Sequence, residues 1–426
     1  MRLNPVAALL ALLVLVYPAV VGATDAVDDW NARAIAAMNA AKRTQVAGVI
    51  DITIVQAAVY DALNAIDGGA FRPYASRPQV HRGASMDAAA AQAAHDVLVF
   101  LYPAQAADLG AALTASLAVV ADGAAKTDGI GAGAAAAAAL IARRLNDGRD
   151  AAIGYTPGTG PGSWQPTPPA FLAAQTPWVA FVLPFTMNAP SQFRPGPPPA
   201  LRSDKWENAF NEVKVRGALV GSDRTADETI QAQFWSDNAP TQYNRYLRRL
   251  AAEQRLAPAA KARLYAEINM AAADGGIACF DAKYTYGLWR PVTAIPAADT
   301  DGNPGTVADL GWLPALVTPN HPEYPSAHAC VSGAITNTLA AFFGSDAVTS
   351  TIDSAVTQTS ATFARFSDLY QYVHEGRILG GLHYRFSMNA GRRIGRDVSR
   401  QLTRHYFTPV PPKDRDEADN RERHER

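Results

Sequence analysis

The sequence has little cysteine, no excess of charge of either sign and, after its first residues, no long apolar run. Cys279 and Cys330 are the only cysteines, so no disulfide framework is expected, and the sequence is compatible with a pair or with two buried thiols. The 38 basic residues nearly balance 39 acidic ones, which argues against nucleic acid as a partner. Apolar residues reach 48%, but much of this share is alanine in helix-like runs, so the mature chain should be soluble.

The one long apolar run lies at the amino terminus. Arg2 precedes the apolar residues 6–21, and Val21-Gly22-Ala23 offers the small residues of a cleavage site. A proline and a glycine shorten the run below the ~20 apolar residues that a membrane-spanning helix needs. We therefore expect residues 1–23 to be a secretory signal peptide. The mature protein should then be secreted or periplasmic, with no membrane segment after cleavage.

Helical periodicity occurs on both sides of a proline-rich segment. Residues 24–150 are predicted to form an N-terminal helical bundle and residues 201–408 a second helical domain. Twelve of the 29 prolines lie within 151–200, a composition that cannot continue a helix and predicts a long ordered loop. Residues 409–426 are mostly charged and should form a disordered tail. The predicted fold class is all-α, with helices over residues 86–102, 104–121, 131–145, 227–235, 242–256, 259–273, 326–343 and 389–406.

Three segments of the second half contain the side chains that an oxyanion site needs. Lys283 and Arg290 are seven residues apart, which on a helix leaves them ~20° from the same face, and the next residue, Pro291, would end that helix. Both cations could then point at one ligand. The alternative for this pair is a solvated helix face.

The second segment, Pro325-Ser326-Ala327-His328, precedes an apolar helix, and the third runs from Arg377 to His383. Amides at the start of a helix are free to bind anions, and the serine adds a hydroxyl donor. Ser326 is alternatively a simple helix cap, and each histidine alone could be a satisfied core residue. Gly380-Gly381, between Arg377 and His383, predicts a break in the helix, because six residues of straight helix place two side chains ~120° apart. The alternative is that the glycines allow another helix to pack closely.

The three segments together complete one pattern: lysine, six residues, Arg-Pro; then Pro-Ser-Gly-His; then arginine, five residues, histidine. The sequence therefore resembles the vanadium-dependent haloperoxidases and the related phosphatidic acid phosphatase type 2 superfamily. Residues 57–67 and Arg72-Pro73-Tyr74 are similar to the N-terminal bundle of bacterial haloperoxidase-like proteins. The resemblance thus extends over roughly residues 30–406. It implies a fold of helical bundles like those of the vanadium haloperoxidases and the phosphatidic acid phosphatase type 2 superfamily.

The resemblance implies a role for each residue of the pattern. The groups that would hold the oxygens of vanadate, or of phosphate in the same site, are Lys283, Arg290, Ser326, Arg377 and the amide of Ala327. His383 would bind vanadium or attack phosphorus, His328 would be the acid–base group, and Lys283 would also polarise bound peroxide.

A further motif resembles the segment in which chloroperoxidases keep an aspartate paired with the acid–base histidine. This motif is Phe234-Trp235-Ser236-Asp237, followed by Tyr243-Asn244-Arg245. Asp237 is therefore the candidate partner of His328. A turn aspartate is the alternative.

Three positions qualify the resemblance. Ala327 replaces the usual glycine, which does no harm if only its amide is used. Ser387 stands where many members have aspartate, and the loss of an aspartate that orients His383 would weaken a phosphatase nucleophile more than a metal ligand. His321, five residues before Ser326, matches a second histidine of bromoperoxidases and favours bromide or iodide over chloride; the alternative is a surface histidine.

The function that the resemblance implies is a vanadate-dependent haloperoxidase acting on hydrogen peroxide and halide. The alternative is an acid phosphatase that hydrolyses a phosphomonoester with His383 as nucleophile. A non-catalytic binding protein for phosphate or vanadate is the third possibility, although two histidines in acid–base and ligand positions are more than storage requires.

Overall fold

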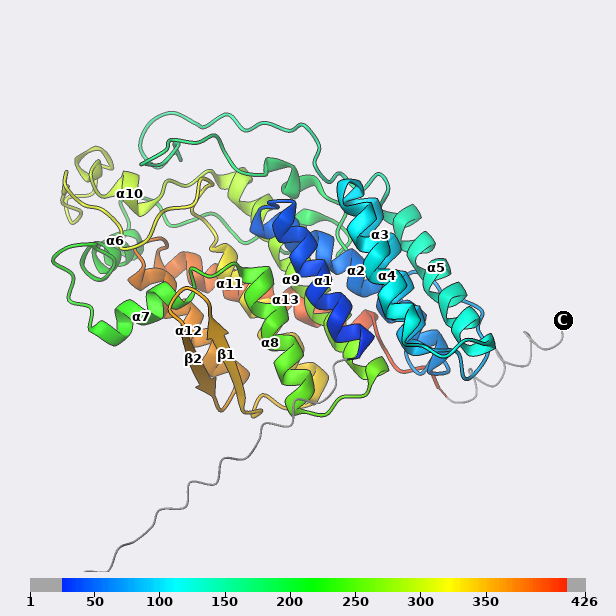
Figure 1. Ribbon diagram of the computed structural model, residues 1–426. Helices are drawn as coiled ribbons and strands as arrows, with labels where there is room; N and C mark the ends of the chain where they lie inside the picture. The colour runs from blue at the N-terminus through cyan, green and yellow to red at the C-terminus, as the bar shows by residue number, and fades with distance from the viewer. Residues whose placement is uncertain (1–24, 412–426) are drawn as a thin grey trace, which may run out of the picture.

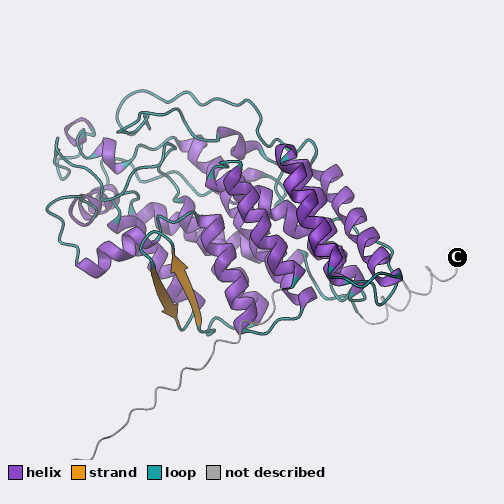
Figure 2. Ribbon diagram, in the orientation of Figure 1, coloured by secondary structure: helices purple, strands orange, loops and turns teal. Residues whose placement is uncertain are grey.

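The structure is a computed structural model that describes residues 25–411. The predicted signal peptide, residues 1–23, and nearly all of the predicted tail, residues 409–426, lie outside the described residues. Within the described part the fold is α-helical with one small hairpin, which confirms the predicted all-α fold class (Figures 1 and 2).

The first part of the chain supplies five α-helices and the second part eight, within the described residues. The helices of the first part are α1 (Ala26–Ala40), α2 (Gln45–Ile66), α3 (Met86–Leu101), α4 (Ala106–Ala118) and α5 (Ala124–Arg144). Those of the second part are α6 (Asp204–Arg216), α7 (Ala226–Phe234), α8 (Ala239–Glu253), α9 (Pro258–Tyr286), α10 (Pro291–Ala294), α11 (Ala327–Phe343), α12 (Phe366–Leu379) and α13 (Arg385–His405).

Side-chain caps explain where several helices begin. Ser85 accepts the amide of Ala88 at the start of α3, and Ser203 caps α6 in the same way. Thr225 and Glu228 form a reciprocal capping box at the start of α7. Such caps satisfy amide donors that have no partner within the helix.

Between α5 and α6 the described chain contains only two 3₁₀ helices, Pro177–Phe181 and Pro190–Phe193. The segment arches over the bundles in Figure 1. It is nevertheless anchored, because Trp164 and Val179 are fully buried and Asp274 of α9 accepts the amides of Phe185 and Thr186 at 2.7 Å.

Helices α2 and α9 hold the two parts of the chain together. Nearly every residue of α2 is buried, and α2 packs against α3 and α5 on one side and against α9 on the other. One hydrophobic core therefore runs from α1 to α13. Among the described residues α2 is the one helix long and apolar enough to cross a membrane, and its burial marks it as the central helix of this core.

The structure corrects two expectations about secondary structure. A hairpin, β1 (Ser350–Ser354) with β2 (Thr359–Phe363), lies beside α8 and α12 in a domain expected to be wholly helical (Figure 2). In β1, the buried residues Ser350, Ile352 and Ser354 alternate with partly exposed ones, as in a strand with one buried face. The alternation covers only five residues, which is too short to predict a strand from the sequence. The predicted helix over 259–273 is part of the much longer α9, because alanine and glycine allow this helix to be buried on all sides.

Candidate active site

The three predicted segments converge deep inside the second part of the chain. Lys283, Arg290 and Ser326 are 0% exposed, Arg377 is 4% exposed and His383 is 2% exposed. We call the group formed by Lys283, Arg290, Ser326, the amide of Ala327, Arg377 and His383 the oxyanion cradle. Burial of so many cations in one place indicates a site for an anion, because isolated buried charges are unfavourable.

Lys283 and Arg290 do not reach the cradle from one helix face, and that expectation is wrong. Helix α9 ends at Tyr286 with Gly287 in the left-handed region at φ 57°, so Arg290 lies in the following loop. Pro291 begins α10 instead of ending α9. The two cations nevertheless reach the same place, because the Lys283 Nζ donates to the carbonyls of Pro322 and Glu323 while the Arg290 Nε donates to that of His321.

The start of α11 forms another wall of the cradle. Ser326 is the N-cap residue, and its side chain accepts the amide of Ala329 at 3.5 Å. The amides of Ala327 and His328 belong to the first turn, where the helix itself offers no acceptor. Ala327 borders the cavity described below and begins α11 in the ordinary helical conformation, so the alanine leaves this amide geometry intact.

The predicted break between Arg377 and His383 is present. Helix α12 ends at Leu379 and α13 begins at Arg385, and Gly381 has φ 74°, a conformation that favours glycine. The alternative role of the glycines, close packing, also applies: the backbone at Gly381 packs so closely against Gly217 that a Cβ on Gly381 would lie 2.5 Å from the Gly217 carbonyl oxygen. His383 therefore enters the cradle from a loop, while Arg377 enters from a helix.

A glutamate that the sequence analysis did not single out orients His383. The fully buried Glu323 accepts the Nδ1–H of His383 at 2.8 Å and the amide of Tyr384 at 3.1 Å, both at Oε1. On the other side of the ring, Arg290 Nη1 lies 3.2 Å from Nε2. Because arginine only donates, Nε2 is the acceptor and its lone pair faces the cradle. The argument from Ser387 against a phosphatase is therefore wrong, since Glu323 supplies the orienting carboxylate.

The electrostatics of the cradle are dominated by burial. Burial, with a smaller contribution from the nearby Arg290, lowers the pKa of Lys283 to about 8 and that of Arg377 to about 9. Burial, followed by Arg290, Lys283 and Arg377, also holds the pKa of His383 well below its usual value. Burial raises the pKa of Glu323 to about 7, against the opposing pull of Lys283 and Arg290. An anion between the cations would oppose the lowering of the Lys283, Arg377 and His383 pKa values, because a nearby negative charge favours the protonated bases, and it would raise the pKa of Glu323 further.

Arg377 shows that the cradle fits an oxyanion. Its Nη1 donates to the carbonyl oxygen of Trp235 at 2.8 Å, while its buried Nε has no hydrogen-bond partner among the described residues. A buried guanidinium nitrogen without an acceptor is unfavourable unless a ligand supplies one. Vanadate and phosphate both supply such oxygens, and the donors around them would be those of the sequence pattern.

Asp237 is not brought to His328. Its carboxylate accepts Arg245 Nη2 at 3.0 Å and the amide of Ala355 at 2.9 Å, so it ties α8 to the hairpin. The carbonyl of Trp235 is instead the hydrogen-bond partner that acts on His328, and it opposes the lowering of that pKa by burial and by Arg377. The alternative of a structural aspartate is therefore the one that the structure supports.

His321 is a buried residue of the site, not a surface histidine. Its Nδ1 accepts Arg290 Nη2 at 2.9 Å, and its ring lies 5.3 Å from that of Phe280. Burial, with Lys283 and Arg290, holds its pKa well below the usual value, so the ring is neutral. The carbonyl oxygen of Pro322 also lies 3.2 Å from Nδ1, but Arg290 is closer and can only donate, which makes Nδ1 the acceptor and leaves the ring proton on Nε2.

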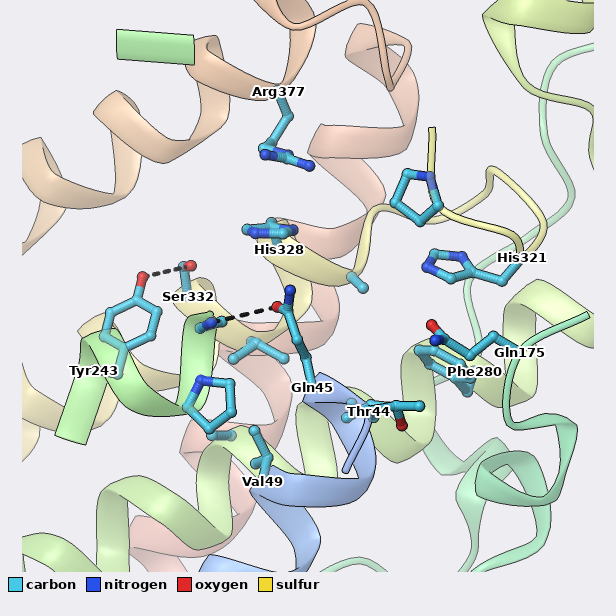
Figure 3. Close-up of a pocket in the computed structure, with 18 of the residues that line it drawn as sticks. Thr44, Gln45, Val49, Gln175, Tyr243, Phe280, His321, His328, Ser332 and Arg377 are labelled. Atoms are coloured by element: carbon cyan, nitrogen blue, oxygen red, sulfur yellow. Dashed lines mark hydrogen bonds between the residues drawn. The ribbon is translucent and has the colours of Figure 1, made fainter. Parts of the chain in front are cut away.

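A cavity of about 260 Å³ gives access to the cradle (Figure 3). His328, His321, Arg377 and His383 border it at one end. Its other walls come from the start of α2, from α8, from α9 and from the loops at Gln175 and Pro319. The N-terminal bundle thus contributes directly to the surroundings of the site.

Comparisons with known proteins agree with this geometry. Residues 263–410 match the family described as the VCPO second helical-bundle domain. A vanadium chloroperoxidase of Curvularia inaequalis is 30% identical in an alignment 172 residues long, which covers 32% of this chain and 28% of that protein. The resemblance to the vanadium haloperoxidases is thereby confirmed, although the alignment spans little more than a quarter of that relative.

Solved structures show the same fold over most of the chain. A bacterial vanadium-dependent iodoperoxidase superimposes with a TM-score of 0.78 at 23% identity, covering 91% of this chain and 98% of that one. A holo-type bacterial vanadium-dependent chloroperoxidase reaches a TM-score of 0.64 at 18% identity, covering 84% and 91%. At these identities the likeness concerns the fold alone.

Proposed function

We propose, from the premise that residues 263–410 form a haloperoxidase-type helical-bundle domain, that this protein is a vanadate-dependent haloperoxidase. It would oxidise bromide or iodide with hydrogen peroxide to the hypohalous acid. The observation that carries the proposal is the oriented His383: Glu323 holds its Nδ1–H, and its Nε2 faces Arg290, while Lys283 and Arg377 lie near enough to act on the ring. A histidine so arranged can bind a metal.

The cradle residues have separable tasks in this reaction. Arg290 and Arg377 would donate to vanadate oxygens, together with the amide of Ala327 and the hydroxyl of Ser326. Bound vanadate would supply Lewis-acid activation of peroxide toward halide. The cations compensate the charge of the anion, and preorganised donors in a buried site do so without the reorganisation that water would need.

Proton transfer falls to the side chains at the cavity. His328 is partly exposed, is held neutral by burial and by Arg377, and can take a proton from peroxide and return it to a leaving oxygen. Lys283, whose pKa burial lowers to about 8, can donate a hydrogen bond to a peroxide oxygen. The Nε2–H of neutral His321 offers a further donor near the cavity, and together with the resemblance it supports a preference for bromide or iodide.

The second candidate function is phosphomonoester hydrolysis, which the Glu323–His383 pair also supports. A carboxylate on Nδ1 makes the opposite ring nitrogen a better nucleophile, which is what attack on phosphorus requires. His328 would then protonate the leaving alcohol.

One parallel assay tests the proposal. Purified protein is given orthovanadate, peroxide and bromide or iodide, and the same preparation without vanadate is given p-nitrophenyl phosphate. Halide oxidation that requires vanadate supports the haloperoxidase, and ester hydrolysis without halide oxidation refutes it.

Export is a separate proposal that rests on residues 1–23. Cleavage after the small residues at 21–23 would release a secreted or periplasmic enzyme. Sequencing the amino terminus of protein recovered outside the cytoplasm should give a start near Thr24. A mature protein that begins at Met1 would contradict the proposal.

A further inference from the structure

The cavity in front of the cradle has an apolar body and few polar groups. Val46 and Val49 of α2, Tyr243 of α8 and Phe280 of α9 line it, together with smaller apolar residues. Gly276 of α9 allows the two bundles to meet there, since a Cβ on it would lie 3.1 Å from Val46 Cγ2. The result is a wall shared by α2 and α9, with two aromatic rings that can contact a flat ligand.

Outside the cradle the cavity offers no free charge among the described residues. Arg43, which borders it, is paired with Asp51 at 2.7 Å and with Asp150 at 2.9 Å, so its charge is compensated. The other polar groups are neutral amides and hydroxyls. The Gln45 side-chain oxygen accepts the amide of Ala239, and its nitrogen faces the cavity on the side of His328 (Figure 3). Gln175 lies near His321 in the same view.

The size of the cavity suits a small ring system. An apolar protein cavity of about 150 Å³ accommodates benzene. The present one measures about 260 Å³ and is bordered by His328 and His383 themselves. It therefore has room for one substituted ring or two fused rings within reach of the groups that would generate the oxidant.

We propose that this cavity binds an uncharged, electron-rich aromatic substrate, which is halogenated there instead of meeting the oxidant in bulk water. The proposal rests on the haloperoxidase function. Apolar walls and the two rings would hold the body of the substrate, and the amides of Gln45 and Gln175 would orient a hydroxyl or amine on it. Hypohalous acid formed at the cradle would meet the ring before leaving the protein.

The reaction balances with peroxide as the oxidant. Halide, hydrogen peroxide and one proton give hypohalous acid and water, with the halogen oxidised by two electrons and the peroxide O–O bond reduced. The aromatic ring then attacks the halogen, a carbon–halogen bond forms and the oxygen–halogen bond breaks. The displaced hydroxide takes the ring proton, which gives the aryl halide and a second water.

The test fills the cavity without touching the cradle. Val46→Phe and Val49→Phe each place a ring where the substrate would lie, and Val46 is partly exposed in the first turn of α2, so its replacement leaves the core in place. Val220→Phe, at a site that is 85% exposed, is the matched control. Binding of 2-naphthol is followed by fluorescence with no vanadate, peroxide or halide present, and iodide oxidation is measured separately without any arene.

We expect saturable 2-naphthol binding by the wild type and by Val220→Phe, and a loss of affinity of at least about tenfold in the two filled variants. Iodide oxidation should be the same in all four proteins, and bromination of 2-naphthol should saturate with arene only where binding is retained. Absence of saturable binding in the wild type, or wild-type affinity in Val46→Phe, would overturn the proposal. Absence of iodide oxidation in the wild type would instead refute the haloperoxidase function, while the binding titration would still report on the cavity.

Discussion

Replacing Glu323 by glutamine separates the orientation of His383 from the binding of the anion. The change keeps the size of the side chain and removes its charge. Glu323 Oε1 accepts both His383 Nδ1–H and the Tyr384 amide, while Lys283 and Arg290 act on the carboxyl from nearby. In the variant an amide NH₂ group competes for the same positions, and His383 loses a charged acceptor.

The expected magnitude follows from the contact that is lost. A buried hydrogen bond to a charged group contributes about 1.5–3 kcal/mol. Loss of the partner that orients a ligating histidine reduces metal affinity or activity by about 10–100-fold. We therefore expect turnover to fall by about 10–100-fold. Affinity for inorganic phosphate should not fall, because removal of a buried negative charge strengthens the attraction of the three cations for an anion.

The assay compares three readouts on one protein. Turnover with vanadate, peroxide and iodide is measured beside phosphate binding by calorimetry. Nitrogen-15 NMR of His383 reports its tautomer, which should be Nδ1–H in the wild type and mixed in Glu323→Gln. A thermal melt of each protein checks that the fold survives.

A compensating variant makes the test specific. Ser387 is fully buried in the first turn of α13, and its hydroxyl lies 3.5 Å from the Glu323 carbonyl oxygen. Glu323→Gln with Ser387→Asp moves the carboxylate to this neighbouring position and should recover a large part of the turnover. The reasoning is refuted if Glu323→Gln keeps wild-type turnover, or if it loses phosphate affinity in proportion to turnover.

Three further predictions follow from the same geometry. Arg377→Ala should weaken phosphate binding by about 1.5–3 kcal/mol, because a buried charged donor is lost, and calorimetry that shows unchanged affinity would contradict this. Phosphate affinity should fall as pH rises through about 8, because binding then requires proton uptake by Lys283, whose pKa burial lowers to about 8; a flat profile would exclude this linkage. Gly381→Ala should destabilise the protein by roughly 1–3 kcal/mol, because φ is 74° and Gly217 leaves no room for a Cβ, and a denaturant titration with an unchanged midpoint would show that the turn adapts.

The convergence of the site could be predicted because the three segments together resemble one family pattern, while the helix start and the helix break within them carry local signals. A serine before an apolar run marks a helix start, and the Gly380-Gly381 pair marks a break, and both are where the sequence places them. The geometry of Lys283 and Arg290 could not be predicted in this way. Helical periodicity does not show that Gly287 ends α9 in the left-handed conformation, because glycine also occurs within this helix.

The partners of the two histidines were harder to predict than the histidines themselves. Glu323 and His383 are sixty residues apart in the sequence and come into contact through the folding of the loop before α11. No local sequence pattern predicts such a contact. One feature of the sequence could have indicated Glu323. It lies between Pro322 and Tyr324, three residues before Ser326, and a glutamate so close to a buried site needs a partner. For Asp237 the sequence offered a different partner, because Arg245 lies about two helical turns further along the chain and forms an ion pair with it.

The most direct test of the central claim is iodide oxidation by wild-type protein, first stripped of vanadate and then titrated with it, at a fixed concentration of peroxide. The account predicts no oxidation in the stripped protein, a saturable gain with vanadate, and competitive loss of that gain when inorganic phosphate is added, because both anions use Arg290, Arg377 and the start of α11. Oxidation that is independent of vanadate, or that phosphate does not suppress, would contradict the assignment of the cradle as the vanadate site.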